Sequence, residues 1–460
     1  MLRLYLAHMK GTSKGPIRTT VNRRSFLTRS LAGVGTLVSS GSVLAQPLIS
    51  SPKTELIAAS GKRRVVIAGG GWGGLSAAKH LRAVAPDLEV IVLEKNPIFW
   101  SCPMSNKWLV NAVDTDLLAH SYIIPAKKYG YTFVQTEITD IDRSAKTVYT
   151  ADGFIKYDWL IIAGGIRYAF EAWFGNDKKT IQYTKTNYAS AYIPSSEHAF
   201  LKNKIQNFKG GTIVMTLPPP PHRCPPSPYE RACLMAWWFK EKKIPAKIII
   251  LDPKPRIAPI TIGYQKAFTE LYSDIITHVP NATVKEVDPY NKIVKTAAGD
   301  FKFDEAILMS PHQAADLVWK ADLIGKDKAG KPTGWAAVDP QYYNTESDPQ
   351  VFVIGDSVGS VSIHFGHYPK SGHVANREAR LVAKYIAAQA KGVEPKAEMI
   401  DNLCFMLVNN SPKEAISVSF SYTMGADDEI LQKAIDDNDR RPELWAEDLK
   451  WLGGMYGDFL

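Results

Sequence analysis

One glycine-rich turn constrains the fold of this 460-residue chain more than any other feature. The segment RRVVIA (Arg63–Ala68), apolar from Val65 onward, predicts a buried strand, and it leads directly into the sequence GGGWGGLSAAKHL. There Gly69, Gly71 and Gly74 have the G-x-G-x-x-G spacing of a dinucleotide-binding turn, which permits a tight turn, close approach of a pyrophosphate and packing of helix on strand. The helix that follows would direct its N-terminal amides toward the phosphates.

Three further segments extend this pattern. LEVIVLE predicts a second strand ending at Glu94, about 20 residues beyond the glycines, where an acid can accept a hydrogen bond from a ribose hydroxyl. YDWLIIAGG, with Gly164, and VFVIGD, ending at Asp356, are strands with glycines or an acid at their tips. Each could alone be a core strand with a surface turn. Together they resemble the later signatures of two-dinucleotide-domain flavoproteins, and this resemblance implies FAD as the cofactor, with Gly164 and Asp356 near it.

The net charge of +9 is concentrated at the N-terminus and does not indicate nucleic-acid binding. Up to Ala45 the chain has seven Lys and Arg and no acid, and subtracting these seven charges from +9 leaves about +2 for the remainder. The segment NRRSFLTRSLAGVGTLVSSGSVLA combines paired arginines, an apolar run and small residues suited to cleavage. It predicts a Tat export signal and a periplasmic protein, where disulfides can persist. No later stretch approaches 18 uninterrupted apolar residues, so we expect no membrane anchor.

A second strand-turn-helix unit carries a different turn. Thr212–Leu217 predicts a strand, and PPPPHRCPPSPYERA follows, with six prolines and no glycine before the predicted helix. Proline lacks a backbone N–H, whereas a pyrophosphate needs several such donors at close range. We therefore expect no NAD(P)H site here and predict that electrons reach the flavin by another route.

This proline-rich turn holds Cys224 just before the helix. Ser227 is predicted as the N-cap, Pro228 as the first helical residue, and Glu230 as the second member of a capping box. Because Cys224 would then lie near a helix N-terminus and beside Arg223, we predict that its pKa is lowered toward a reactive thiolate.

Several segments resemble the flavoprotein subunit of flavocytochrome c sulfide dehydrogenase: RCPPSPYERA, WSCPMSN, GDSV, YPKSGHVAN and LCF. In that family the residue matching Cys102 forms a thioether to FAD, and those matching Cys224 and Cys404 form a redox disulfide. The resemblance therefore implies oxidation of hydrosulfide, with electrons passed to a haem-bearing c-type cytochrome subunit. It also suggests Glu230 as an acid–base group and Lys370 as a cation that stabilises reduced flavin.

The residues themselves leave alternatives open. Four cysteines allow three pairings, and the sequence does not choose among them. Cys102 could be an unmodified thiol, Glu230 could serve only as a helix cap, and Lys370 could be solvated at a helix start. Cys233, among apolar helical residues, is interpreted as buried and inert.

The sequence HFGHYPKSGH adds His364, His367 and His373, which lie outside the family pattern. Imidazoles can bind copper or zinc, but this spacing is not a known ligand pattern, so we predict no metal and retain these three as minor candidates. The chain has no C-x-x-C-H motif for c-type haem, and the electron acceptor is therefore expected to be a separate protein.

We predict an α/β protein with two Rossmann-like dinucleotide-binding domains, the first binding FAD, and a smaller C-terminal interface domain. The predicted boundaries are 1–45 (signal peptide), 46–60 (linker), 61–175 and 323–392 (FAD domain), 176–322 (second domain, with Cys224) and 393–460 (C-terminal domain, with Cys404). The first alternative function is a sulfide:quinone oxidoreductase, although the acids in ELWAEDLKWLGGMYGDFL are unfavourable at a lipid surface. Others are a non-catalytic flavin-binding or sulfur-carrier protein and an enzyme for another sulfur compound.

Overall fold

The computed structural model describes residues 54–460. The predicted signal peptide and most of the predicted linker lie outside these residues. Among the helices described, none combines the length and the apolar character needed to span a bilayer.

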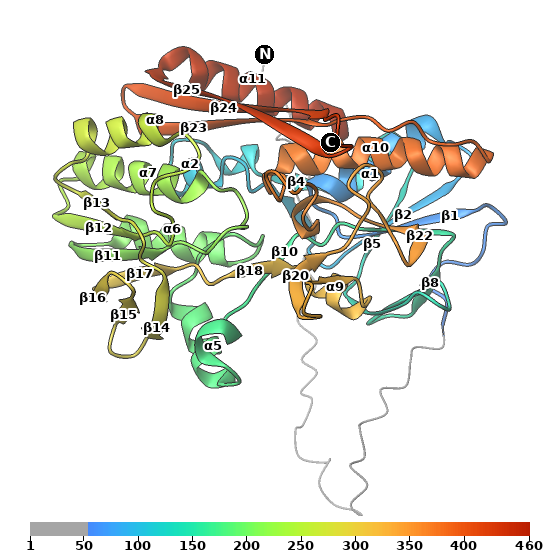
Figure 1. The fold of residues 1–460 in the computed structure, drawn as a ribbon, viewed down its shortest axis with the longest axis horizontal. Coiled ribbons are helices and arrows are strands. Elements are labelled where there is room, and N and C mark those ends of the chain that lie inside the picture. The colour runs from blue at the N-terminus through green and yellow to red at the C-terminus, as the bar shows by residue number, and fades with distance from the viewer. Residues whose placement is uncertain (1–53) are drawn as a thin grey trace, which may run out of the picture. The chain divides into compact units, whose positions relative to one another are not determined.

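The first sheet combines strands from two distant parts of the chain. Its order is β21-β22-β9-β1-β2-β5, and β1 pairs in parallel with both β2 and β9. Its strands are β1 (Arg64–Ala68), β2 (Glu89–Glu94), β5 (Thr132–Gln135), β9 (Trp159–Ile162), β21 (Asn344–Thr345) and β22 (Asp348–Val353). Helices α1 (Trp72–Val84) and α10 (Gly372–Lys391) lie side by side against it (Figure 1).

Strand β1 is buried along its whole length, as expected for a central parallel strand covered on both faces. The glycine turn follows as predicted. Gly69 has φ +116°, a conformation that favours glycine, and a Cβ at Gly74 would lie 1.8 Å from the Gly69 carbonyl oxygen. Both glycines are therefore required for α1 to begin this close to the strand.

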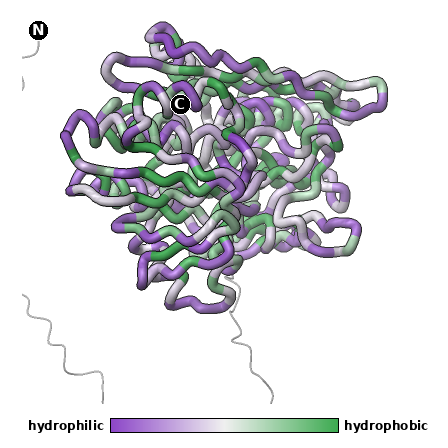
Figure 2. The backbone as a smooth tube through the Cα atoms, turned by 60° about the vertical axis from the view of Figure 1, so that its left-hand side comes forward, coloured by the Kyte–Doolittle hydropathy of each residue, from purple (hydrophilic) through white to green (hydrophobic). Residues whose placement is uncertain are grey.

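The second sheet is fully parallel, in the order β13-β12-β11-β17. Its strands are β11 (Gly211–Thr216), β12 (Ala246–Leu251), β13 (Ile276–Val279) and β17 (Glu305–Leu308), and helix α7 (Ser227–Glu241) packs against β12. Figure 2 shows hydrophobic stretches within the body of the protein and hydrophilic residues along many outer loops.

The predicted capping box at the start of α7 is wrong. The N-cap is Pro226, and no side chain caps the helix. Ser227 instead accepts hydrogen bonds from Asn106 (2.9 Å) and Tyr192 (3.1 Å). Glu230 turns toward Asn106, whose amide donates to it at 2.8 Å. Tertiary partners therefore replace the local pairing that the sequence suggested.

The C-terminal part is an antiparallel sheet followed by a helix: β23 (Asp401–Asn410), β24 (Lys413–Met424), β25 (Ile430–Arg441) and α11 (Pro442–Phe459). Strand β23 contacts α7 and α10, whereas α11 packs against β24 and α1 (Figure 1). The predicted fold class is confirmed: two dinucleotide-binding folds with a C-terminal domain. The residue boundaries assigned to the domains stay predictions.

Smaller elements complete the fold. The short sheets pair β3 (Ile98–Trp100) with β4 (Ala119–Ser121), β6 (Ile138–Asp142) with β7 (Thr147–Thr150) and β8 (Phe154–Lys156), β10 (Ile166–Tyr168) with β18 (His312–Ala314), β14 (Val284–Asp288) with β15 (Ile293–Thr296) and β16 (Gly299–Lys302), and β19 (Ile324–Lys326) with β20 (Pro332–Ala336). The shorter helices are α2 (Ser105–Leu109), α3 (Ile123–Tyr129), α4 (Glu171–Phe174), α5 (Lys178–Asn187), α6 (Glu197–Asn207), α8 (Thr261–Lys266) and α9 (Asp316–Lys320).

Candidate active site

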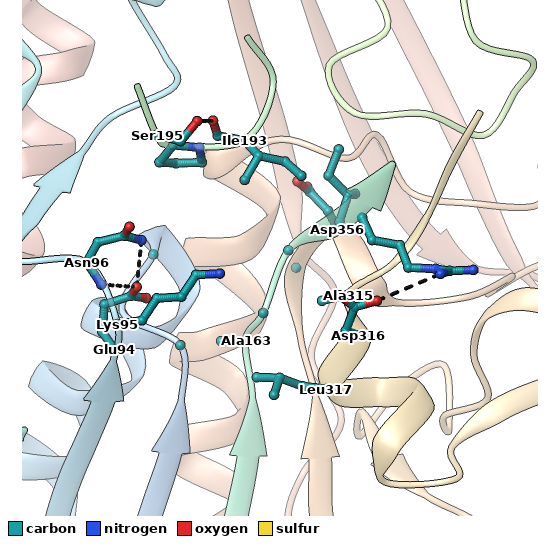
Figure 3. Close-up of a pocket in the computed structure, with 18 of the residues that line it drawn as sticks. Glu94, Lys95, Asn96, Ala163, Ile193, Ser195, Ala315, Asp316, Leu317 and Asp356 are labelled. Carbon is teal, nitrogen blue, oxygen red and sulfur yellow. Dashed lines mark hydrogen bonds and ion pairs between the residues drawn. The ribbon is translucent and has the colours of Figure 1, made fainter. Parts of the chain in front are cut away.

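A cavity of about 710 Å³ lies at the carboxyl ends of the first sheet's strands. Five predicted site residues line it: Gly69, Gly71, Glu94, Gly164 and Asp356. In Figure 3, Glu94 and Asn96 border one side, and Asp316 and Asp356 lie toward the other, with Ala163 between them. Open parallel sheets bind nucleotides at this end, so the predicted residues surround one dinucleotide-sized site.

The glycine turn fits a dinucleotide. A Cβ built at Gly71 would meet no protein atom within 4 Å, so the backbone there is open to a ligand. Helix α1 begins at Trp72, directly beyond Gly71, so the amides of its first turn would be available to a bound phosphate. Glu94 accepts hydrogen bonds from the backbone N–H groups of Gly70 and Asn96, both at 2.8 Å. These bonds fix the carboxylate at the cavity wall.

Asp356 is bound by an arginine from the proline-rich turn. Arg223 Nε lies 2.8 Å from Asp356 Oδ2, and Arg223 Nη1 donates to the Tyr192 carbonyl at 2.6 Å. The aspartate side chain is 5% exposed and the arginine 20%, so both charges are largely removed from water. The expected contact of Asp356 with the cofactor stays a prediction. Its partner within the chain is Arg223.

A second cavity, of about 100 Å³, is lined by Cys102, Cys224 and Cys404 together. The two cavities share Trp72, Arg223, Ser371 and Gly372 in their walls. All four cysteines are free thiols in this structure, and Cys233 is fully buried within α7. The pairing of Cys224 with Cys404 stays a prediction, but the fold brings both residues, from distant parts of the chain, to one cavity that we call the cysteine cavity.

Cys224 is held rigidly. It has φ +49°, which is uncommon for a residue other than glycine, and its N–H donates to the Lys370 carbonyl at 2.8 Å. The neighbouring N–H of Arg223 donates to His312 Nδ1 at 3.1 Å. Two amides of the proline-rich turn are therefore engaged within the protein, consistent with the prediction that this turn does not cradle a phosphate.

The predicted lowering of the Cys224 pKa is wrong. Burial raises the pKa of this thiol, and nearby Cys404 raises it further, while Arg223 lowers it by less. Burial also raises the pKa of Cys404 to about 11. A hydrogen bond from the Asn402 amide, at 3.5 Å, lowers this pKa by less than burial raises it. The pKa of the Cys102 thiol is likewise raised by burial. The prediction considered only the adjacent helix start and arginine, whereas other parts of the chain, including β23, bury the site.

Lys370 is buried and not solvated. Its Nζ donates to the Val358 carbonyl at 2.7 Å and lies 3.9 Å from the centroid of the Trp335 ring. Burial lowers the pKa of this lysine to about 8, although Asp356 and Glu378 oppose the shift. It lines the cysteine cavity, so a cation is available there near neutral pH.

Glu230 belongs to a buried ionic network that the sequence did not reveal. Its Oε1 lies 2.9 Å from Lys107 Nζ and accepts from the Leu407 N–H at 2.9 Å, while Oε2 accepts from the Asn106 amide at 2.8 Å. Lys107 Nζ also lies 3.1 Å from Asp448 Oδ2. Apart from Leu407, all these residues line the cysteine cavity. No spacing rule links Lys107 with Asp448, because the fold alone brings α2 and α11 together.

The three candidate histidines have separate partners. His364 Nε2 lies 2.9 Å from Asp427, the His367 ring packs against Trp335, and His373 Nδ1 accepts from the Leu403 N–H at 2.9 Å. Within residues 54–460, no group of three or more His, Cys, Asp or Glu side chains is placed to hold a metal.

Comparison with known proteins adds independent evidence. Residues 63–199 match the family model for pyridine nucleotide-disulphide oxidoreductases, and residues 198–308 match the central region of the sulfide dehydrogenase [flavocytochrome c] flavoprotein chain. A sulfide-quinone reductase of Aquifex aeolicus is 24% identical over 344 residues, covering 70% of this chain and 76% of the relative. The sulfide dehydrogenase flavoprotein chain of Chlorobaculum thiosulfatiphilum is 48% identical over 46 residues, which are 10% of this chain and 96% of that sequence.

Among solved structures, the sulfide:quinone oxidoreductase of Aquifex aeolicus superposes with a TM-score of 0.66 at 20% identity, covering 86% of this chain and 92% of that one. Fold and cavity together define a two-dinucleotide-domain flavoprotein oxidoreductase, a class that implies FAD as cofactor. Within this class, the chain belongs to the sulfide-oxidising flavoproteins.

Proposed function

We propose that this protein oxidises hydrosulfide at Cys224 and Cys404 while FAD occupies the adjoining cavity. One observation carries the proposal: both cysteines line a cavity of about 100 Å³ that shares a wall with the dinucleotide cavity. A liquid water molecule takes about 30 Å³, so the smaller cavity suits a substrate of a few atoms.

The chain's residues have defined parts in this chemistry. When Cys224 and Cys404 are joined as a disulfide, hydrosulfide attacks one sulfur, the S–S bond breaks, and a persulfide forms on one cysteine while the other leaves as a thiolate. Arg223 and Lys370 line the cavity and stabilise the anionic substrate and this thiolate. Bound FAD would supply the two-electron oxidation that restores the disulfide, and the outer sulfur of the persulfide leaves in the same step as zero-valent sulfur, free or joined to further hydrosulfide as a polysulfide. We also propose that Cys102, in the same wall, carries the flavin through a thioether.

Cysteine variants test this function. Cys224→Ala and Cys404→Ala should retain flavin but lose at least ~100-fold in the rate of flavin bleaching by sulfide under anaerobic stopped-flow conditions, because the persulfide can no longer form. Cys233→Ala, which removes a cysteine outside the cavity, is the matched control and should keep the rate. Bleaching at the wild-type rate in both cavity variants would reject the proposal. Failure of the wild-type protein to bleach would favour a sulfur carrier.

Two electron acceptors have support. A quinone, the alternative in the sequence analysis, has the stronger support, because similarity to sulfide:quinone oxidoreductases extends over most of the chain. A c-type cytochrome is supported by the central-region match and by the short Chlorobaculum match. Parallel assays of sulfide oxidation with a soluble quinone and with a c-type cytochrome distinguish them by kcat/KM.

Two features complete the proposal. We propose that residues 1–45 direct Tat export to the periplasm. Fractionation of cells that produce the wild-type chain and an Arg23→Lys/Arg24→Lys variant tests this proposal.

Mass spectrometry of a non-reduced digest tests the flavin adduct on Cys102 and the crosslink between Cys224 and Cys404. Finding Cys102 only as an unmodified thiol would reject the thioether.

A further inference from the structure

The proposed reaction requires a proton acceptor other than the leaving thiolate, which must stay ionised to pass its electrons on, and this inference rests on the proposed function. Attack by hydrosulfide leaves the group Cys–S–SH, and its proton must leave before the sulfur can react further as an anion. A carboxylate in the cavity wall can accept this proton, provided that it is within reach and has a free lone pair. The wall contains two carboxylates, Glu230 and Asp448.

Glu230 is poorly suited to accept a proton. Its Oε1 is occupied by Lys107 Nζ and the Leu407 N–H, both at 2.9 Å, and its Oε2 by the Asn106 amide at 2.8 Å. Protonation would displace at least one of these donors within a buried network, which costs the desolvation of the group left unpaired. Glu230 therefore serves better as a fixed anchor for α2, α7 and β23.

Asp448 has the opposite surroundings. The residue is 2% exposed, and its Oδ2 has no hydrogen bond of good geometry among the described residues; its polar contact is Lys107 Nζ, at 3.1 Å. A buried oxygen that lines a cavity with spare hydrogen-bonding capacity requires an explanation. The explanation we favour is that this oxygen is left free to accept a proton from a donor that enters the cavity.

The charge balance supports the same residue. Two carboxylates share one ammonium, so the cluster of Lys107, Glu230 and Asp448 has a net charge of −1 and becomes neutral when it binds one proton. Burial raises the pKa of Asp448 to about 6, and Glu230 raises it further, while Lys107 opposes the shift. The other titratable or charged groups of the cavity wall are Cys102, Tyr192, Arg223 and Cys224 before α7, Arg231 on α7, Lys370 and His373 near the start of α10, and Cys404 on β23.

We propose that Asp448, held on α11 by Lys107, accepts the proton released when hydrosulfide forms the persulfide. The Cys–S–SH group loses its proton to Oδ2, giving Cys–S–S⁻ and a neutral carboxylic acid, with no change in oxidation state in this step. Lys107 remains an ammonium and is a positioning residue.

The test uses the full-length flavoprotein as wild type, Asp448→Asn and Glu447→Gln, the last removing an exposed carboxylate from the adjacent position of the same helix. At saturating sulfide, Asp448→Asn should reduce the rate of flavin bleaching by about 100-fold, within the range for loss of an acid–base group. The wild-type rate should rise with pH around an apparent pKa near 6, and this dependence should be absent in Asp448→Asn. Glu447→Gln should match the wild type.

A second readout requires no turnover. Infrared difference spectra between pH 7.5 and pH 5 should show a protonated carboxylic acid band in the wild type and Glu447→Gln that is missing in Asp448→Asn. If Asp448→Asn fails to fold, Lys107→Met replaces it. Loss of the ammonium should shift the Asp448 titration to higher pH in the infrared spectra.

An unchanged rate and pH profile in Asp448→Asn, with a wild type that bleaches normally, would overturn this inference alone. An infrared titration that is unaltered in both Asp448→Asn and Lys107→Met would overturn it as well. If the infrared spectra of the wild type show the Asp448 titration but sulfide does not bleach its flavin, the proposed function is refuted. The proton-accepting role of Asp448 is then refuted as well.

Discussion

Replacing Arg223 with methionine should destabilise the protein more than the loss of an ordinary surface ion pair. The Arg223 side chain is 20% exposed, its partner Asp356 is 5% exposed, and their closest atoms are 2.8 Å apart. Removing one member of a buried pair leaves an uncompensated charge and costs about 3–5 kcal/mol. Breaking the 2.6 Å hydrogen bond to the Tyr192 carbonyl adds about 1 kcal/mol.

A second arginine provides the matched control. Arg377 Nε lies 2.6 Å from Asp401, but that aspartate is 58% exposed, so Arg377→Met should cost less than about 1 kcal/mol. The assay is equilibrium urea unfolding followed by tryptophan fluorescence, at equal flavin content and with comparison of both midpoint and slope. The double variant Arg223→Met/Asp356→Asn should recover at least ~1 kcal/mol relative to Arg223→Met, because it also removes the unpaired charge. An Arg223→Met variant no less stable than Arg377→Met would refute the reasoning.

Two other measurements test the fold around the site. His198 is 1% exposed, and burial is the main cause that lowers its pKa to about 3. Below about pH 6.5, this imidazole therefore binds a proton in the unfolded chain but not in the folded chain. This residue should therefore remove about 3 kcal/mol of stability between pH 7 and pH 4, and urea unfolding of His198→Leu should show a smaller acid loss than wild type; equal losses would contradict this. Gly74→Ala places a Cβ 1.8 Å from the Gly69 carbonyl oxygen and should prevent stable folding, whereas Gly71→Ala, facing open space, should fold but bind less flavin. Thermal unfolding and flavin absorbance check both, and a Gly74→Ala protein as stable as wild type would contradict the packing argument.

The sequence revealed the parts of the site that depend on neighbouring residues. The strand, the glycine turn and Glu94 follow one another along the chain, so a spacing rule predicts them, and the structure has this arrangement. The start of α7 shows the limit of local rules, because Ser227 satisfies a capping pattern yet bonds to Asn106 and Tyr192.

The errors at Cys224 and the omission of Asp448 have a related cause. A helix start and an adjacent arginine predict a lowered thiol pKa, but this expectation assumes access to water, and β23 helps to exclude it. Lys107 and Asp448 are unremarkable in sequence, one in a short helix and the other among surface residues of α11. Their pairing depends on the packing of α11, which no periodicity or motif encodes.

The packing of α11 also has a consequence for biosynthesis. Trp72, at the start of the glycine-turn helix, stacks on Trp451 with ring centroids 6.1 Å apart and contacts Phe459 at 5.1 Å. A ribosome makes the glycine turn early and α11 only after some 370 further residues, so the wall around Trp72 is incomplete while translation proceeds. Stable binding of the cofactor, if it depends on the packing of α11 against Trp72, must therefore follow synthesis of residues 442–459. Nascent chains stalled before that point should release flavin readily.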